Sequence, residues 1–184
     1  MQYTFPYASP LGRITLASDG ESLTGLWFNG QKHFGTALLP EAEERALPVF
    51  ALTERWLDAF FRGVSPEPAP PVSLRGSPFR LAVWEALLTI PRGETRTYGE
   101  LARTVAERLG RKRMSAQAVG GAVGHNPISL IVPCHRVVGA DGSLTGYAGG
   151  LERKLRLLEL EGADLRRLYV PGQGRRTAER EAEA

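Results

Sequence analysis

Residues 131–138 read IVPCHRVV, in which a Cys-His-Arg triplet lies between apolar residues. Cys134 is the only cysteine, which excludes an internal disulfide and any zinc site built from several thiolates. On composition alone, a lone cysteine is more often a small buried hydrophobe than a reactive group. A thiol beside an imidazole and a guanidinium, however, has the electropositive surroundings that favour thiolate. The apolar residues on both sides predict a shielded pocket for it.

The region before this stretch has the capping signals of three helices. Ser77-Pro78 is an N-cap followed by proline at the first helical position. Thr97 and Glu100 have the spacing of a capping box, and Ser115 is the N-cap of a short helix over Ala116–His125. Two short helices joined by a turn, the second rich in small residues, indicate a helix-turn-helix.

The region around and after the cysteine is expected to be extended and then helical. Asn126-Pro127 ends the short helix, and residues 128–138 are largely apolar and β-branched, as in a strand. Neighbouring residues of a strand point to opposite faces, so a Cys-His pair alone is weak evidence of a site. Asp141-Gly142 predicts a hairpin turn and hence a wing. The last helix is expected over Leu151–Glu161.

The first part of the chain has the pattern of a small sheet packed on a helix. Three stretches alternate as strands do: Tyr3–Tyr7, Leu11–Ser18 and Ser22–Phe28. Residues 41–62 carry a helical apolar stripe, broken or preceded by Pro48. No chemical motif is found in this part.

Charge is unevenly distributed between the two parts. The net charge is +3, but residues 1–70 hold 5 basic and 8 acidic side chains, whereas residues 71–170 hold 15 basic and 9 acidic ones. A basic second part suggests contact with a polyanion, although an Arg-rich solvated surface explains the count equally well. No apolar run approaches the roughly 18 residues of a membrane span, and no secretory signal begins the chain, so we expect a cytoplasmic protein. With three histidines and one cysteine, no structural metal is expected.

The cysteine motif also resembles that of a known family. Pro133-Cys134-His135-Arg136-Val137 resembles the acceptor-cysteine signature of the 6-O-alkylguanine-DNA alkyltransferases. The resemblance covers roughly residues 79–162. Further matches occur in the order in which the family has them: Thr97-Tyr98-Gly99, Ala118-Val119-Gly120-Gly121-Ala122, Asn126-Pro127 and Gly146-Tyr147-Ala148-Gly149-Gly150-Leu151.

This resemblance implies a set of catalytic roles. Cys134 would attack the alkyl carbon on O6 of guanine, His135 would take the thiol proton through a water, and Glu161 would stabilise the imidazolium. Asn126 would brace the turn that holds the site. Tyr98 would press on the lesion's phosphate and offer its hydroxyl to the leaving guanine. Because no residue regenerates the thiol, the enzyme would act once and inactivate itself.

The resemblance also implies how substrate and DNA are bound. The expected base pocket is lined by Val137, Tyr147, Ala148 and Gly149. The partner would be duplex DNA with an alkylated guanine, flipped out of the stack while a helix enters the minor groove. The expected DNA-binding residues are Ala116, Gln117, Gly120 and Gly121 in that helix, and Arg111, Lys112 and Arg113 before it. For the three basic residues a solvated turn is an equally open alternative. No cofactor is implied, and we expect a monomer.

The implied architecture is α+β with two domains. The first, residues 1–63, would be a small antiparallel sheet with a helix, resembling ribonuclease H. A proline-rich linker at residues 64–76 would lead to the DNA-binding and alkyl-acceptor domain, a winged helix-turn-helix over residues 77–170. Residues 171–184 are expected to be a disordered tail.

Two departures and two alternatives accompany this interpretation. Gln117 stands where the family usually has an arginine that fills the gap left by the guanine, and the connection before it is several residues longer than usual. One alternative is a non-catalytic lesion-binding relative, but that group replaces the cysteine which this chain retains. Another, a thiol redox or hydrolytic enzyme, would not explain the small-residue helix. The preferred alkyl group, and activity on 4-O-alkylthymine, are not fixed by the sequence.

Overall fold

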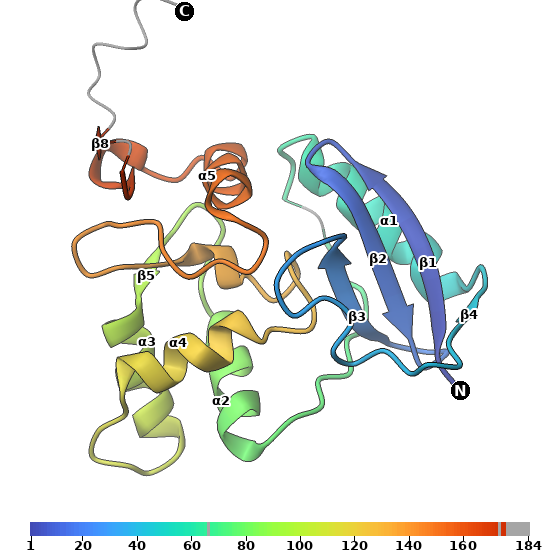
Figure 1. Cartoon of the computed structure of the whole chain (residues 1–184), viewed down its shortest axis with the longest axis horizontal. Coiled ribbons are helices and arrows are strands. Elements are labelled where there is room, and N and C mark those ends of the chain that lie inside the picture. Colours follow the sequence, from blue (N-terminus) through green and yellow to red (C-terminus); the bar gives the residue numbers. More distant parts are fainter. Residues whose placement is uncertain (66, 173, 176–184) are drawn as a thin grey trace, which may run out of the picture.

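The computed structural model describes residues 1–65, 67–172, 174 and 175 (Figure 1). The elements in chain order are β1 (Tyr3–Ser9), β2 (Gly12–Ser18), β3 (Leu23–Phe28), β4 (Glu43–Glu44), α1 (Pro48–Phe61), α2 (Pro78–Leu87), β5 (Arg96–Thr97), α3 (Tyr98–Arg108), α4 (Ala116–Gly124), the 3-10 helix η1 (Cys134–Arg136), β6 (Val137–Val138), α5 (Leu151–Leu160), the 3-10 helix η2 (Leu165–Arg167), β7 (Tyr169–Val170) and β8 (Gly174–Arg175).

The first part is a four-stranded sheet in the order β3-β2-β1-β4, with α1 packed on one face (Figure 1). The expected strands form, and β1–β2 and β2–β3 pair antiparallel. The helix expected from residue 41 begins only at Pro48, while Glu43 and Glu44 add a short parallel strand beside β1. Proline is favoured in the first turn of a helix, where its missing N–H has no intrahelical partner, and this explains the late start.

The edge of this sheet formed by β3 is covered by later segments of the chain. In β3, the Leu26 N–H donates to Pro127 O at 2.9 Å, and the Ser129 N–H donates back to Leu26 O at 2.9 Å. The proline-rich segment pairs at the same edge, through Leu23 N–H to Pro71 O at 2.8 Å and Ser73 N–H to Leu23 O at 2.7 Å. These bonds satisfy backbone groups that a free edge would leave open. The sheet therefore directly braces the turn that follows α4.

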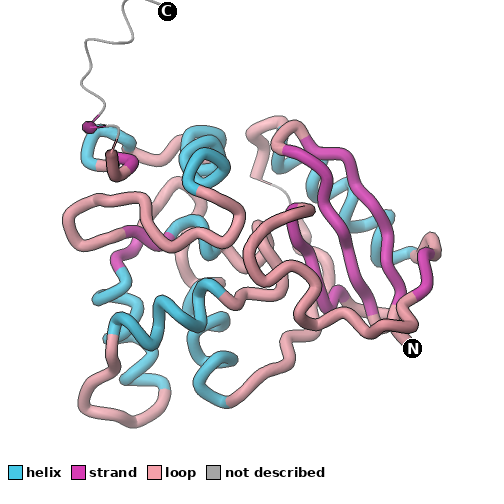
Figure 2. Tube along the Cα trace, in the orientation of Figure 1, coloured by secondary structure: helices cyan, strands magenta, loops and turns pink. Residues whose placement is uncertain are grey.

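The second part is helical, as expected, and its helices begin at the expected caps. The side chain of Ser77 accepts from the Arg80 N–H at the start of α2. Thr97 and Glu100 form the reciprocal capping box of α3, and Ser115 caps α4. In Figure 2 these helices gather on the side of the molecule away from the sheet. Tyr98 and the small residues of α4 are thereby placed on adjacent helices.

The expected strand over residues 128–138 is not found. Val132 N–H donates to Ile128 O at 3.0 Å and Cys134 N–H donates to Val132 O at 2.8 Å, so the backbone folds on itself in turns that lead into η1. Among residues 128–138, Ile128 makes an isolated parallel bridge with Leu26, and Val137–Val138 form a strand that pairs parallel with β5. In a strand the cysteine and histidine would point to opposite faces. The turn instead buries both side chains.

The expected turn at Asp141-Gly142 is present, closed by Gly139 N–H to Ser143 O at 2.8 Å. Gly142 has φ +87, and a Cβ there would lie 2.0 Å from Arg167 O, so this position requires glycine. Beyond the turn, Ser143 forms a bridge with Tyr169. The expected disordered tail falls mainly on residues 173 and 176–184, which lie outside the described residues.

Candidate active site

Cys134 lies in η1, with 5 % of its surface exposed. The side-chain amide of Asn126 holds it: Nδ2 donates to Cys134 Sγ at 3.1 Å and to Val132 O at 2.7 Å. Asn126 Oδ1 in turn accepts from Ile128 N–H at 3.0 Å. Asn126 is itself buried, and all three bonds fix its orientation. The sulfur is therefore held in place by one amide.

The resting cysteine is a thiol. Burial raises the pKa of Cys134, and the hydrogen bond from Asn126 and the charge of Lys154 act against this rise without overcoming it. Electropositive neighbours led us to expect conditions that favour thiolate, but the cost of desolvating the sulfur outweighs them. Reaction at this sulfur therefore needs a base that removes the proton.

His135, next in sequence, is linked to a buried carboxylate. Its Nε2 lies 2.9 Å from Glu161 Oε1. The same carboxylate accepts two bonds from Arg136, Nε to Oε2 at 2.8 Å and Nη2 to Oε1 at 2.7 Å. Arg136 also donates through Nη1 to Ile90 O at 2.5 Å. Glu161 caps the end of α5 and so joins that helix to η1.

The charges of His135, Arg136 and Glu161 determine which nitrogen of His135 can act as a base. Burial alone would raise the pKa of Glu161, but the hydrogen bonds from His135 and Arg136 lower it to about 2, so the group is a carboxylate. A carboxylate only accepts hydrogen bonds, which places the imidazole hydrogen on Nε2. Burial lowers the pKa of His135, which is therefore neutral near pH 7. Its Nδ1 then carries a lone pair, is buried, and has no hydrogen-bond partner among the described residues.

Lys154 is a site residue that the sequence interpretation missed. Its side chain is fully buried and its Nζ donates to Val137 O and to Thr145 O, the latter at 2.7 Å. Burial lowers its pKa to about 8, while Cys134 acts in the opposite direction. A signal was available: Lys154 lies three and four residues before Leu157 and Leu158 on the buried stripe of α5, where a charge is unexpected.

Tyr98 joins the helices to the loop at residues 145–150, which we call the pocket loop. Its hydroxyl donates to Thr145 O at 3.0 Å. Its ring lies 3.5 Å from where a Cβ of Gly120 would be, so glycine lets α4 approach this ring closely. Burial, with a smaller effect from Cys134, raises the pKa of Tyr98 to about 12. The hydroxyl therefore keeps its proton and can serve as a donor.

The residues expected to line the base pocket lie in β6 and the pocket loop. Val137, Tyr147 and Gly149 are buried, and Ala148 is half-buried. A Cβ on Gly149 would lie 2.5 Å from the Tyr147 ring, so glycine is needed for this packing. The Tyr147 hydroxyl is buried without a hydrogen-bond partner among the described residues.

The residues expected to bind DNA are exposed. On α4, Ala116, Gln117 and Gly121 are open to solvent, and Gly120 is half-buried against Tyr98. The basic residues before α4 are exposed as well, and they line a groove of about 390 Å³ against α3. The groove is lined by Gly99, Ala102, Arg103, Ala106, Glu107, Arg111, Lys112, Arg113, Met114 and Ala116. Arg108 instead pairs with Glu85 at 3.6 Å.

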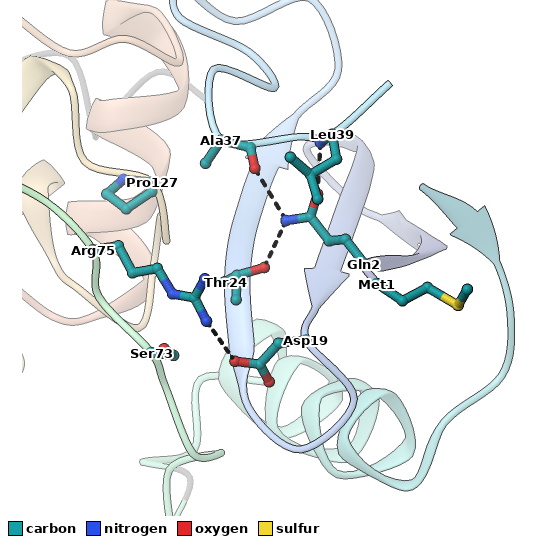
Figure 3. A pocket seen from close by; sticks show the side chains of 9 residues that line it. All are labelled: Met1, Gln2, Asp19, Thr24, Ala37, Leu39, Ser73, Arg75 and Pro127. Carbon is teal, nitrogen blue, oxygen red and sulfur yellow. Dashed lines mark hydrogen bonds and ion pairs between the residues drawn. The ribbon is translucent and has the colours of Figure 1, made fainter. Parts of the chain in front are cut away.

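A second cavity, of about 300 Å³, lies between the sheet and the segment before α2 (Figure 3). Gln2 organises one wall by donating to Thr24 Oγ1 and Ala37 O, both at 3.0 Å. Across from it, Arg75 pairs with Asp19 at 3.3 Å. The lining contains none of the expected site residues. Gln2 and Thr24, and likewise Arg75 and Asp19, are already bonded to each other, and we assign the cavity no role.

Two family models match this chain. The model described as 6-O-methylguanine DNA methyltransferase, ribonuclease-like domain, matches residues 1–69. The model described as 6-O-methylguanine DNA methyltransferase, DNA binding domain, matches residues 78–163. Both the expected ribonuclease H-like first part and the DNA-binding second part agree with these matches.

Curated relatives and solved structures agree. A methylated-DNA–protein-cysteine methyltransferase of Mycobacterium tuberculosis is 47% identical over 153 residues, 83% of this chain and 88% of the relative. One of Haemophilus influenzae is 42% identical over 162 residues, 88% of this chain and 86% of the relative. The crystal structure of Mycobacterium tuberculosis OGT in complex with DNA superposes with a TM-score of 0.74 at 44% identity, covering 87% of this chain and 92% of that one.

The chain is thus a DNA-repair protein of the alkyl-transferring class. It belongs to the 6-O-methylguanine DNA methyltransferase family, and its activity is the transfer of an alkyl group from DNA to a cysteine of the protein. Cys134 is the only cysteine that can receive it. Among the described residues, no helix is both long and apolar enough to cross a membrane.

Proposed function

We propose that Cys134 accepts the alkyl group from O6 of a guanine that has left the DNA stack. The sulfur attacks the alkyl carbon in line with the C–O6 bond, so an S–C bond forms as that bond breaks. The thiol proton passes to His135, and the Tyr98 hydroxyl donates a hydrogen bond to the departing guanine. The imidazolium then releases its proton to solvent, and the guanine takes one up from solvent. The products are a thioether on the protein and restored guanine in the DNA.

The observation that carries this proposal is the buried Nδ1 of His135, which follows Cys134 in the chain and has no hydrogen-bond partner among the described residues. Nδ1 of His135 has a free lone pair in a buried setting, and Nε2 is bonded to a carboxylate that stabilises the imidazolium once the proton arrives. A water between Nδ1 and the sulfur would relay the proton. Asn126 holds the sulfur throughout. Because a thioether does not hydrolyse, the proposed reaction occurs once per molecule.

We propose that α4 and the basic groove beside it bind the DNA. A flipped base is reached only if a helix lies close to the duplex, and the exposed face of α4 is made of small residues with Gln117 among them. A narrow minor groove accepts such a face, whereas larger side chains would hold the backbone away. The groove lined by Arg111, Lys112 and Arg113 adjoins α4 and offers positive charge to the phosphates.

The organisation of the chain is part of the proposal. We infer a first domain over residues 1–63, a proline-rich connection over 64–76 and the reactive domain over 77–170. We also infer that the protein acts as a monomer in the cytoplasm. Sedimentation of the free protein and of its complex with a short duplex tests the monomeric state, and a second copy in either sample would contradict it.

Base flipping and groove choice can be tested together with the Cys134→Ala variant, which cannot turn over. Fluorescence of 2-aminopurine placed beside the methylated guanine should rise on binding, because the neighbouring base loses its stacking partner. Dimethyl sulfate should be blocked at adenine N3 in the minor groove and not at guanine N7 in the major groove. Protection at N7 instead would contradict the minor-groove proposal, and unchanged fluorescence would contradict flipping.

A further inference from the structure

Besides the bonds of Tyr98 and Lys154 to Thr145 O, the pocket loop, residues 145–150, is held from outside at Ala148 and Gly149. The Lys32 N–H, in the first part of the chain, donates to Ala148 O at 3.0 Å. Arg153 Nη1, in the first turn of α5, donates to Gly149 O at 2.9 Å. Two consecutive carbonyls of the loop, directly after the buried Tyr147, are therefore fixed.

Arg153 reaches further than the loop. Its Nε donates to Leu11 O at 2.8 Å, in the turn between β1 and β2. Its guanidinium also lies over the ring of Phe28, with Cζ 4.9 Å from the ring centroid. One planar group thus bonds two carbonyls and stacks on an aromatic face, a combination that the point charge of a lysine cannot reproduce.

The position of Arg153 in its helix argues that it serves these contacts. The first turn of a helix disfavours positive charge, because the helix dipole leaves that end positive. Arg153 occupies the first turn of α5 and yet is half-buried there. Burial raises the pKa of Tyr147, and the charge of Arg153 is one of the smaller influences and opposes this rise.

We propose that Arg153 is a positioning residue for the base pocket: it ties the Gly149 carbonyl to the sheet at Leu11 and Phe28, so that the sheet sets where Tyr147 and Ala148 meet the flipped base. This rests on the proposed function, in which the pocket loop receives that base. It gives the first part of the chain, which carries no reactive group, a defined task in the reaction.

The test compares Arg153→Met and Arg153→Lys with Arg156→Met, a matched control. Arg156 lies on the same helix, is exposed and pairs with Glu159. The readouts are the rate constant of methyl transfer at saturating methylated duplex, the dissociation constant for unmodified duplex, and the rate at which iodoacetamide modifies Cys134. All are measured at a temperature where circular dichroism shows each variant folded.

Arg153→Met should lower the saturating transfer rate by about 10-fold or more, since a misplaced pocket costs orientation rather than binding. Arg153→Lys should not restore the wild-type rate. Affinity for unmodified duplex and the iodoacetamide rate should stay within about two-fold of wild type, as should all values for Arg156→Met. A wild-type transfer rate in Arg153→Met would overturn the proposal. This holds even if the melting temperature of the variant fell, because Arg153 would then stabilise the fold without positioning the base pocket.

Tyr147→Ala separates this inference from the proposed function. If Tyr147→Ala transfers methyl at the wild-type rate, the pocket loop does not receive the base, and the proposed function is wrong at that point. If Tyr147→Ala is slow while Arg153→Met is not, the base pocket stands and only the role of Arg153 is rejected. Slow transfer in both variants supports both.

Discussion

Glu161 accepts a hydrogen bond from Nε2 of His135 at 2.9 Å and thereby leaves Nδ1 as the ring nitrogen that can act as a base. The carboxylate can do this because Arg136 supplies two further bonds that keep it charged although it is buried. Glu161 thus orients the imidazole, and His135 is the base. General-base activation of a nucleophile requires this arrangement of a nucleophile, a base and a group that orients the base.

Replacing this carboxylate should slow alkyl transfer. Glu161→Gln removes the charge that stabilises the imidazolium, so we expect the saturating transfer rate to fall by about 100-fold. Glu152→Gln, on the exposed side of the same helix, is the control and should react as wild type. Transfer is followed by mass spectrometry after rapid quenching. A rate within about two-fold of wild type would mean that His135 does not depend on Glu161.

The same carboxylate should make stability depend on acid pH. Its pKa is about 2 in the folded protein against an ordinary 4.5, so its contribution is complete above pH 4.5 and is lost as pH falls towards 2. That shift corresponds to about 3 kcal/mol. His135 acts in the same direction at higher pH: its pKa is lowered on folding, so stability already declines as pH falls below 6.5.

Urea unfolding of the wild type and of Glu161→Gln isolates the carboxylate's share. The difference in free energy of unfolding between them should be largest near pH 6 and should shrink steadily between pH 4.5 and 3. A difference that stays constant over this range would show that Glu161 does not titrate with a lowered pKa.

Gln117 should limit how firmly the flipped state is held. Glutamine can fill part of the gap in the stack but brings no charge, so Gln117→Arg should tighten binding to methylated duplex in the Cys134→Ala background. Fluorescence titration measures the dissociation constant, which Gln117→Arg should lower and Gln117→Ala should raise. Equal or weaker binding by Gln117→Arg would show that position 117 does not enter the stack.

The basic groove should contribute to the salt dependence of DNA binding. Changing Arg111, Lys112 and Arg113 together to alanine should reduce the slope of log K against log salt by roughly 0.9 for each phosphate that is no longer neutralised. Arg108→Ala is a useful control because this arginine already pairs with Glu85. An unchanged slope in the triple variant would remove the groove from the interface.

Features that depend on neighbouring residues could be predicted from the sequence. The caps at Ser77, Thr97 and Ser115 and the strands β1 to β3 all appear where expected, because caps and alternation are local signals. The residues assigned by resemblance to the reactive group also come together in space: Asn126 bonds Cys134, and Glu161 bonds His135. The assignment of their roles stays a prediction.

Features that depend on distant parts of the chain could not be predicted. Residues 128–138 have strand-like composition, but their turns are set by pairing of Ser129 with Leu26 in the sheet, about a hundred positions earlier in the chain. Arg153 bonds Leu11, 142 positions away. The protonated state of Cys134 likewise follows from burial, which the electropositive neighbours in the sequence do not reveal.

The most direct test of the account is the intact mass of the protein after mixing with excess duplex that contains 6-O-methylguanine. We expect each molecule to gain one methyl group and no more, located by peptide mapping on Cys134, and Cys134→Ala to gain none. An unchanged mass, a methyl group on another residue, or continued turnover of methylated duplex by the alkylated protein would contradict it.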